Sequence, residues 1–248
     1  VTHHLNLAHG LAVSRLRNKV PEAKIGTIIT MQPVVGWEND PDSSARLDAL
    51  SNRAFTDPAL LGTYPELLID ELSPFIQQGD LELIHQPLDF FGLNHYTTMR
   101  ACSAPDDALG VEIIQPPPEI PQTIKGWEIN PEMFYQQLLE LKDRYGNLPV
   151  YITENGCAAP DKLGSDGKVS DPERVAYFRD YLSAASRAIE DGVNLKGYFA
   201  WSLMDNFEWA SGYAKRFGLH YVDFDTLERI PKASADWYKK AIQANGLK

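Results

Sequence analysis

Two hydrophobic spacings alternate along this chain, one typical of helices and one typical of buried strands. In residues 5–20 the apolar side chains recur with the period of one helix face, at Leu5, Ala8, Leu11, Ala12 and Leu16. Pro21 would end this helix, because proline lacks the amide hydrogen that the next turn needs. The following segment, KIGTIITM at residues 24–31, is rich in apolar residues and predicts a strand. A helix followed by a strand is the repeating unit of α/β proteins.

This alternation continues to the end of the sequence. Further strands are predicted at residues 88–96, 148–154 and 195–203, and long helices at residues 131–145, 171–191 and 233–244. Short helices are predicted near residues 45–55 and 65–73, and the proline-rich segment 115–121 predicts a surface loop. These four main strands occupy a length in which a complete (β/α)8 barrel shows about eight. We therefore expect an α/β fold with a single domain, residues 1–248, that forms half of a barrel.

Composition limits the classes of partner. Hydrophobic residues make up 44% of the chain and charged residues 23%, which is ordinary for a globular protein. The formal net charge of −11 disfavours nucleic acid and anionic membranes as partners, since both attract clustered Lys and Arg. No apolar run approaches the roughly 20 residues of a membrane span, and the sequence starts without a signal-peptide pattern. With only two cysteines, which do not indicate a disulfide framework, we expect a cytoplasmic protein.

Polar and aromatic residues gather where three of the predicted strands end. Glu154 follows an apolar strand and precedes Asn-Gly, a place where an ionised carboxylate is costly unless it is paired or has a function. Asn94 and Tyr96 lie two residues apart and should face the same side of their strand. Residues 200–209, AWSLMDNFEW, combine aromatic rings that can stack on sugars with carboxylates and amides that bond hydroxyl groups. These strand ends therefore indicate a saccharide site.

Four motifs resemble those of glycoside hydrolase family 1, the retaining β-glucosidases and β-galactosidases. They are DFFGLNHYT at residues 89–97, YITENG at 151–156, GYFAWSLMDNFEWASGYAKRFGL at 197–219 and YVDF at 221–224. The opening HHLNLAHGLAV and the segment FTDPALLGTYPE are also similar, so the resemblance spans essentially the whole chain. It implies the C-terminal half of a (β/α)8 TIM barrel, strands 5–8, which requires an N-terminal half to close.

The resemblance also implies a role for each matching residue. Glu154 corresponds to the catalytic nucleophile that forms a glycosyl-enzyme, and Tyr96 to the tyrosine that hydrogen-bonds this carboxylate and favours its ionised form. The residues that correspond to substrate contacts are Asn94 in the same pocket, Trp201 as the glycone platform, Glu208 and Trp209 at the 4- and 6-hydroxyls, Trp127 on the aglycone side and Phe217 near the rim. The family also implies a cis peptide between Trp201 and Ser202.

Glu208 bears on the class of substrate. In the branch of the family that acts on 6-phosphorylated sugars, small residues with a Ser and a Lys replace this part of the motif, whereas a carboxylate would repel a phosphate dianion. Lys215 keeps the ordinary position in the AKRFG run. We therefore expect retaining hydrolysis of neutral β-D-glucosides or related oligosaccharides, with glucose preferred and galactose and fucose tolerated. The resemblance implies no metal and no organic cofactor.

The family's general acid/base is expected to come from a partner. In the family this glutamate belongs to an Asn-Glu-Pro motif at the end of the fourth strand, and that motif does not occur here, where Val1 would lie just downstream of it. An N-terminal half-barrel chain would then supply the proton donor. Because general acid catalysis contributes about 10²–10⁴-fold, the chain alone should be inactive on unactivated glycosides.

Two other interpretations remain open. A half-barrel that keeps its aromatic platforms but lacks an acid/base could be a non-catalytic carbohydrate-binding or regulatory module, and a half-barrel that self-associates could be purely structural. Among the side chains that could suggest other chemistry, structural roles are expected for His3, His4 and His9 and for Asp205 at a turn. Cys157 is expected to be a packed thiol, because no histidine motif flanks it.

Overall fold

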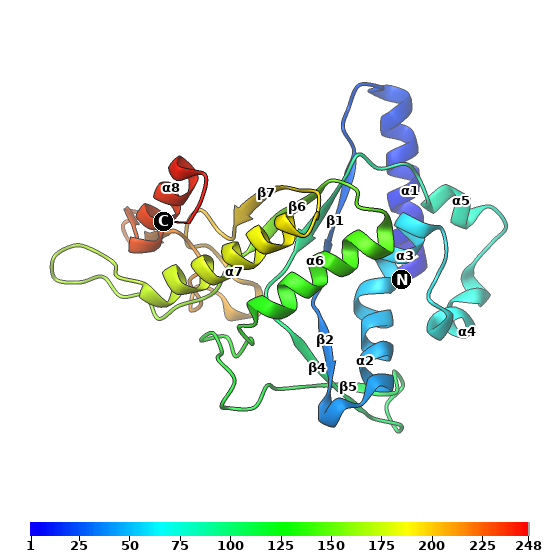
Figure 1. Cartoon of the computed structure of the whole chain (residues 1–248), viewed down its shortest axis with the longest axis horizontal. Helices are drawn as coiled ribbons and strands as arrows, with labels where there is room; N and C mark the ends of the chain where they lie inside the picture. Colours follow the sequence, from blue (N-terminus) through cyan, green and yellow to red (C-terminus); the bar gives the residue numbers. More distant parts are fainter. Residues whose placement is uncertain (248) are drawn as a thin grey trace. The chain divides into compact units, whose positions relative to one another are not determined.

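A computed structural model describes residues 1–247 of the chain (Figure 1). These residues form two compact units that interleave along the sequence. The first unit comprises residues 1–94, 99–115 and 140–151, and the second comprises residues 95–98, 116–139 and those from 152 onward. Among the residues described, no helix combines the length and the apolar character needed to cross a bilayer.

The first unit contains a parallel strand pair and a small mixed sheet. Its helices are α1 (Thr2–Lys19), α2 (Pro41–Asp48), α3 (Ala54–Leu61), α4 (Ile69–Leu72) and α5 (Asp80–Ile84), and its strands are β1 (Gly26–Thr30), β2 (Val34–Gly36), β3 (Phe90–Asn94), β4 (Met99–Ser103) and β5 (Val111–Ile114). β1 pairs in parallel with β3, β2 in parallel with β4, and β4 antiparallel with β5. The helix α2 packs on the small sheet, as Figure 1 shows.

Local chemistry explains where α2 begins. Asp40 precedes the helix, and its side chain accepts hydrogen bonds from Asp42 N at 3.0 Å and Ser43 N at 3.2 Å. These amides have no partner inside the helix, so a carboxylate there stabilises the first turn. Pro41 occupies the first turn, where its missing amide hydrogen is not needed. The apolar side of α2 contributes Leu47 to a buried cluster with Ala101 and Val111.

The second unit contains most of the C-terminal half of the chain. Its elements are α7 (Pro172–Glu190), β7 (Leu195–Ala200), the short turn η5 (Trp209–Ser211), β8 (His220–Val222), β9 (Arg229–Pro231) and α8 (Ala233–Ala244), while α6 (Pro131–Tyr145) and β6 (Val150–Asn155) have residues in both units. β8 and β9 form an antiparallel hairpin. The hydrogen-bonded order of the four strands in the main sheet is β1, β3, β6, β7.

Aromatic residues build the core of the second unit. The buried rings of Tyr177 and Tyr181 stack on successive turns of α7, with their centroids 4.2 Å apart. Phe178, also on α7, lies 5.8 Å from the ring of Tyr238 on α8. The hydroxyl of Tyr238 donates to the carbonyl oxygen of Tyr198 on β7 at 3.0 Å. Figure 1 shows α7, α8 and β7 gathered in this arrangement.

The predicted long helices and main strands are confirmed with small shifts of their ends. The helix at residues 131–145 begins and ends as expected, because Pro131 suits a first turn and Gly146, with φ of 79°, adopts the left-handed conformation that terminates helices. The segment 115–121 lies outside regular structure, as expected. The sheet of β2, β4 and β5 and the hairpin of β8 and β9 were not predicted. Of these strands, β2, β8 and β9 are only three residues long, too short to show a hydrophobic period.

Candidate active site

The end of β6 brings Glu154 to Tyr96. The amide of His95 donates to the carbonyl oxygen of Glu154 at 2.9 Å, which aligns the residue after His95 with the glutamate. The hydroxyl of Tyr96 then donates a short hydrogen bond to Glu154 Oε2. Burial raises the pKa of Tyr96 well above its usual value, and the Glu154 carboxylate raises it further. Tyr96 therefore stays a hydrogen-bond donor and stabilises the charge of Glu154.

The buried side-chain amide of Asn155 supports the segment that carries Tyr96. Asn155 is fully buried, and its Nδ2 donates to the carbonyl oxygen of His95 at 2.8 Å and to the hydroxyl of Tyr177 at 3.0 Å. The hydroxyl of Tyr198 donates to Asn155 Oδ1. The side chain thus joins the segment of Tyr96 to α7 and β7. Asn155 lies in the YITENG motif but was not assigned a role, because its partners are distant in sequence.

The residue after this amide must be glycine. A Cβ added to Gly156 would lie 2.0 Å from the carbonyl oxygen of Trp201, a separation that backbone atoms cannot accommodate. The amide of Trp201 also donates to the carbonyl oxygen of Asn155 at 2.9 Å. The expected cis peptide between Trp201 and Ser202 is present at this point. The end of β6 and the segment after β7 therefore lie in close backbone contact.

Tyr96, the hydrogen-bond partner of Glu154, packs with two further aromatic rings, Trp127 and Phe217. The centroid of Tyr96 lies 5.3 Å from that of Trp127 and 6.2 Å from that of Phe217, and the last two lie 5.9 Å apart. Trp127 is half-buried and leaves part of its surface accessible. Phe217 is only 2% exposed, so its ring is packed within this cluster, and its expected place near the pocket rim stays a prediction. The cluster forms an apolar wall suited to a sugar ring.

Glu208 lies in the same unit, and it is buried whereas its neighbour Trp209 is exposed. Glu208 is buried, and Lys125 Nζ donates to its Oε1 at 2.6 Å. Trp209 is 82% exposed and has a φ of 44°. Trp201 is half-buried. Of the predicted substrate contacts, Trp127 and Glu208 therefore share one ion-paired cluster through Lys125, which sequence reasoning did not single out.

Asn94 belongs to the first unit. It ends β3 and is 9% exposed, and its carbonyl oxygen accepts a hydrogen bond from Met31 N at 3.1 Å. Its predicted place beside Glu154 stays a prediction.

The fold agrees with what comparisons with known proteins show. A sequence model described as Glycosyl hydrolase family 1 matches residues 1–247. The chain belongs to this family. A bifunctional beta-D-glucosidase/beta-D-fucosidase of Bifidobacterium breve is 44% identical over 97% of this chain, and Beta-glucosidase A of Acetivibrio thermocellus is 42% identical over 99%.

Solved structures support the same assignment. The beta-glucosidase of Thermotoga maritima in complex with azafagomine superimposes with a TM-score of 0.92 over 100% of this chain, at 38% identity. The chain spans about 56% of the length of that structure and 56–57% of the two relatives named above. The α/β fold therefore matches part of a family 1 barrel.

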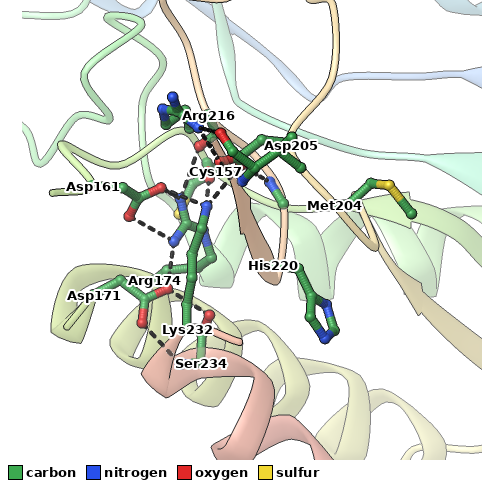
Figure 2. A network of polar contacts seen from close by, with 12 residues as sticks. Cys157, Asp161, Asp171, Arg174, Met204, Asp205, Arg216, His220, Lys232 and Ser234 are labelled. Carbon is green, nitrogen blue, oxygen red and sulfur yellow. Dashed lines mark hydrogen bonds and ion pairs between the residues drawn. The ribbon is translucent and has the colours of Figure 1, made fainter. Parts of the chain in front are cut away.

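The second unit of this family 1 chain also contains a largely buried network of three cations and three anions (Figure 2). Arg174 Nη1 and Nη2 donate to the two oxygens of Asp161 at 2.9 and 2.7 Å, and Arg174 also pairs with Asp171. Lys232 Nζ donates to Asp161 at 2.6 Å and to Asp205 at 2.7 Å. Burial lowers the pKa of Lys232, and the nearby Arg174 charge lowers it further. Each charge has an opposite partner, which is what burial of ions requires.

Asp205 and Arg216 connect residues 201–219, the segment between β7 and β8 that contains Glu208 and Phe217, to this network. Arg216 Nη1 donates to Asp205 Oδ2 at 2.6 Å, and Gly218 N donates to Asp205 Oδ1 at 2.9 Å. The expected structural role of Asp205 at a turn is confirmed. Figure 2 shows both side chains directed into the network.

The remaining reactive groups have structural surroundings. Burial raises the pKa of Cys157 to about 12, so the thiol stays protonated and unreactive, as expected. His3 hydrogen-bonds Tyr64 and Asp80, each at 2.9 Å, which agrees with a structural role. Within residues 1–247 no group of three or more His, Cys, Asp or Glu side chains is arranged to hold a metal ion.

Proposed function

We propose that this chain carries the nucleophile and much of the glycone pocket of a retaining β-glucosidase. The observation that carries the proposal is the hydrogen bond from Tyr96 to Glu154, beside the aromatic wall that contains Trp127. The phenolic hydrogen bond holds the half-buried Glu154 carboxylate in one orientation. Glu154 would attack the anomeric carbon and form the glycosyl-enzyme, which water then hydrolyses.

The substrate proposed is a β-linked neutral hexose, with glucose preferred. Trp201 and Trp127 would stack on the glycone and aglycone rings, and Glu208 and Trp209 would contact the 4- and 6-hydroxyls. Support comes from the two relatives, whose names are beta-glucosidase A and bifunctional beta-D-glucosidase/beta-D-fucosidase. D-Fucose differs from D-glucose in its configuration at C4 and in having no hydroxyl at C6, so a site that accepts both does not depend on either hydroxyl alone.

The remaining strands of the barrel would supply the general acid/base, either from the same polypeptide or from a second chain. In a retaining enzyme this carboxyl lies about 5–5.5 Å from the nucleophile, across the glycosidic bond. The 56% coverage of the relatives supports this division. Apolar side chains also stand exposed on strands of each unit, Ile28 on β1 and Phe199 on β7, each 57% exposed. Exposed apolar strand positions of this kind are typical of surfaces that another part of a fold covers.

The test is Glu154→Gln in the completed barrel, which preserves shape but removes the nucleophilic charge. Turnover of a 4-nitrophenyl β-D-glucoside should fall by at least about 10³-fold. Glu190→Gln, which changes an exposed glutamate at the end of α7, should leave turnover unchanged. A 2-deoxy-2-fluoroglucoside should label the wild-type protein on the peptide that contains Glu154.

Retained turnover in the Glu154→Gln protein, or a label on another carboxylate, would overturn the assignment. Sugar binding without any turnover in the completed wild-type barrel would favour a carbohydrate-binding module.

A further inference from the structure

Lys125 places a cation inside the proposed sugar site. Its Nζ lies 2.6 Å from Glu208 Oε1, 4.3 Å from the ring centroid of Trp127 and 5.5 Å from that of Phe217. The side chain is 21% exposed and that of Glu208 9% exposed, so water screens the pair only in part. The ammonium therefore interacts with residues proposed to bind both halves of a glycoside.

The backbone fixes the position from which Lys125 reaches. Thr123 Oγ1 accepts hydrogen bonds from the amides of Lys125 and Trp127, each at 3.3 Å, and the amide of Gly126 donates to the Thr123 carbonyl at 2.9 Å. Gly126 has a φ of 79°, which favours glycine and closes the turn. Lys125 therefore projects from a hydrogen-bonded turn that also contains Trp127.

The same turn is tied to the segment of Glu208. Lys215 Nζ donates to the carbonyl oxygen of Ile124 at 2.6 Å. The two lysines have different tasks, since Lys215 bonds a backbone carbonyl and Lys125 pairs with a carboxylate. Two links therefore join the turn to the segment of Glu208: Lys215 to the Ile124 carbonyl, and Lys125 to Glu208.

Lys125 has more hydrogen-bond donors than its pair with Glu208 uses. An ammonium has three N–H donors, and within residues 1–247 its hydrogen-bond partner is the single Oε1 of Glu208. The positive charge also offsets that of Glu208, so a second anion brought to this pair meets no net repulsion. Without Lys125, Glu208 alone would repel such a group by its full charge.

We propose that Lys125 is a specificity-determining residue that donates to an anionic oxygen group at C6 of the sugar, beside Glu208. The inference rests on the proposed function, which places the sugar's 6-position at Glu208. The ligand class is a hexuronic acid, whose carboxylate replaces the 6-hydroxymethyl group. The site would then accept both glucose and its uronic acid, with Glu208 accepting from hydroxyls and Lys125 donating to the carboxylate.

The experiment measures competitive inhibition of β-glucoside hydrolysis in the completed barrel at pH 7, by D-glucose and by D-glucuronate. The two sugars differ only at C6, and the carboxyl of glucuronate is ionised at this pH. Lys125→Met keeps the length of the side chain and removes its charge. It should raise the inhibition constant of glucuronate at least about fivefold more than that of glucose, the factor expected for one charge pair about 4 Å apart in a high dielectric.

Two further variants separate charge from shape. Lys125→Arg keeps the charge and should restore most of the preference, and Lys125→Gln should repeat the effect of Lys125→Met if that variant folds poorly. Lys162→Met, which removes an exposed lysine from the same unit, should leave the ratio unchanged.

Equal changes for both sugars, or an unchanged ratio in both neutral variants, would overturn the role of Lys125. A wild-type protein that neither hydrolyses the glucoside nor binds glucose would overturn the proposed function instead, and this inference with it.

Discussion

At the scale of single residues, His95 is the clearest link between burial and pH. Its ring is fully buried, with centroids 4.7 Å from Phe134 and 5.6 Å from Tyr181. Nδ1 donates to Gln137 Oε1 at 2.8 Å, while Nε2 has no partner among the residues described. Burial lowers the pKa of His95 to about 4, and the bond to Gln137 opposes this only in part. The folded protein therefore holds the ring neutral.

This burial predicts a loss of stability in mild acid. Between pH 6.5 and about 4 the unfolded chain binds a proton at His95 and the folded chain does not, so the unfolding free energy falls as the pH falls. The total loss should reach about 3 kcal/mol, from a pKa difference of about 2.5. Chemical unfolding at pH 7, 5.5 and 4 measures it. His95→Gln should remove this part of the slope, whereas His85→Gln, at an exposed histidine, should keep it.

At the scale of elements, the segment from β7 to β8 has little regular structure of its own. Its order comes from side chains that reach into the buried network, above all Asp205, which bonds Lys232, Arg216 and Gly218 N. Within this segment η5 is the only helix, three residues long. Glu208 and Phe217 are both proposed to contact the sugar. Glu208 lies between Asp205 and Arg216 in the sequence and Phe217 directly follows Arg216, so the network sets their positions.

Removing one anion from the network should therefore loosen this segment. Asp205→Asn keeps the shape but leaves Lys232 and Arg216 with less compensation for their charges, and it should lower the unfolding free energy by about 3 kcal/mol or more. Asp225→Asn, at an exposed position in the turn after β8, should change it by less than about 0.5 kcal/mol. Thermal unfolding of the two variants compares them directly. A loss below about 1 kcal/mol for Asp205→Asn would show that the network does not stabilise the segment.

At the scale of the whole molecule, the chain spans about 56% of the length of the family 1 relatives it matches. We predict that the chain alone hydrolyses an unactivated β-glucoside at least about 10²-fold more slowly than the same chain combined with the rest of a family 1 barrel, because the combination adds leaving-group protonation. Native mass spectrometry of the mixture would show whether a complex forms. The same mixture made with Glu154→Gln is the control. Equal rates with and without the added part would contradict the prediction.

Local pattern was sufficient for the long elements and for the strand that ends at Glu154. The helix at residues 131–145 and the strand ending at residues 154–155 depend on hydrophobic period, proline and glycine, which act over a few neighbours. The roles proposed for Glu154 and Tyr96 rest on family motifs that are contiguous in the sequence, and that of Trp127 on the short segment GWEI at residues 126–129. Contiguous motifs carry such information because each one encodes a short piece of backbone with its side chains.

Packing between distant residues decided the rest. Lys125 pairs with Glu208, which lies 83 residues later in the sequence, and Asn155 hydrogen-bonds both His95 and Tyr177. A local hydrophobic period cannot reveal such contacts. The strands β2 and β8 are three residues long and are strands only because a partner accepts their backbone hydrogen bonds. The burial of Phe217 likewise depends on rings from two other segments. Hydrophobic period records which face of an element is buried, but only the folded chain determines which residue lies against it.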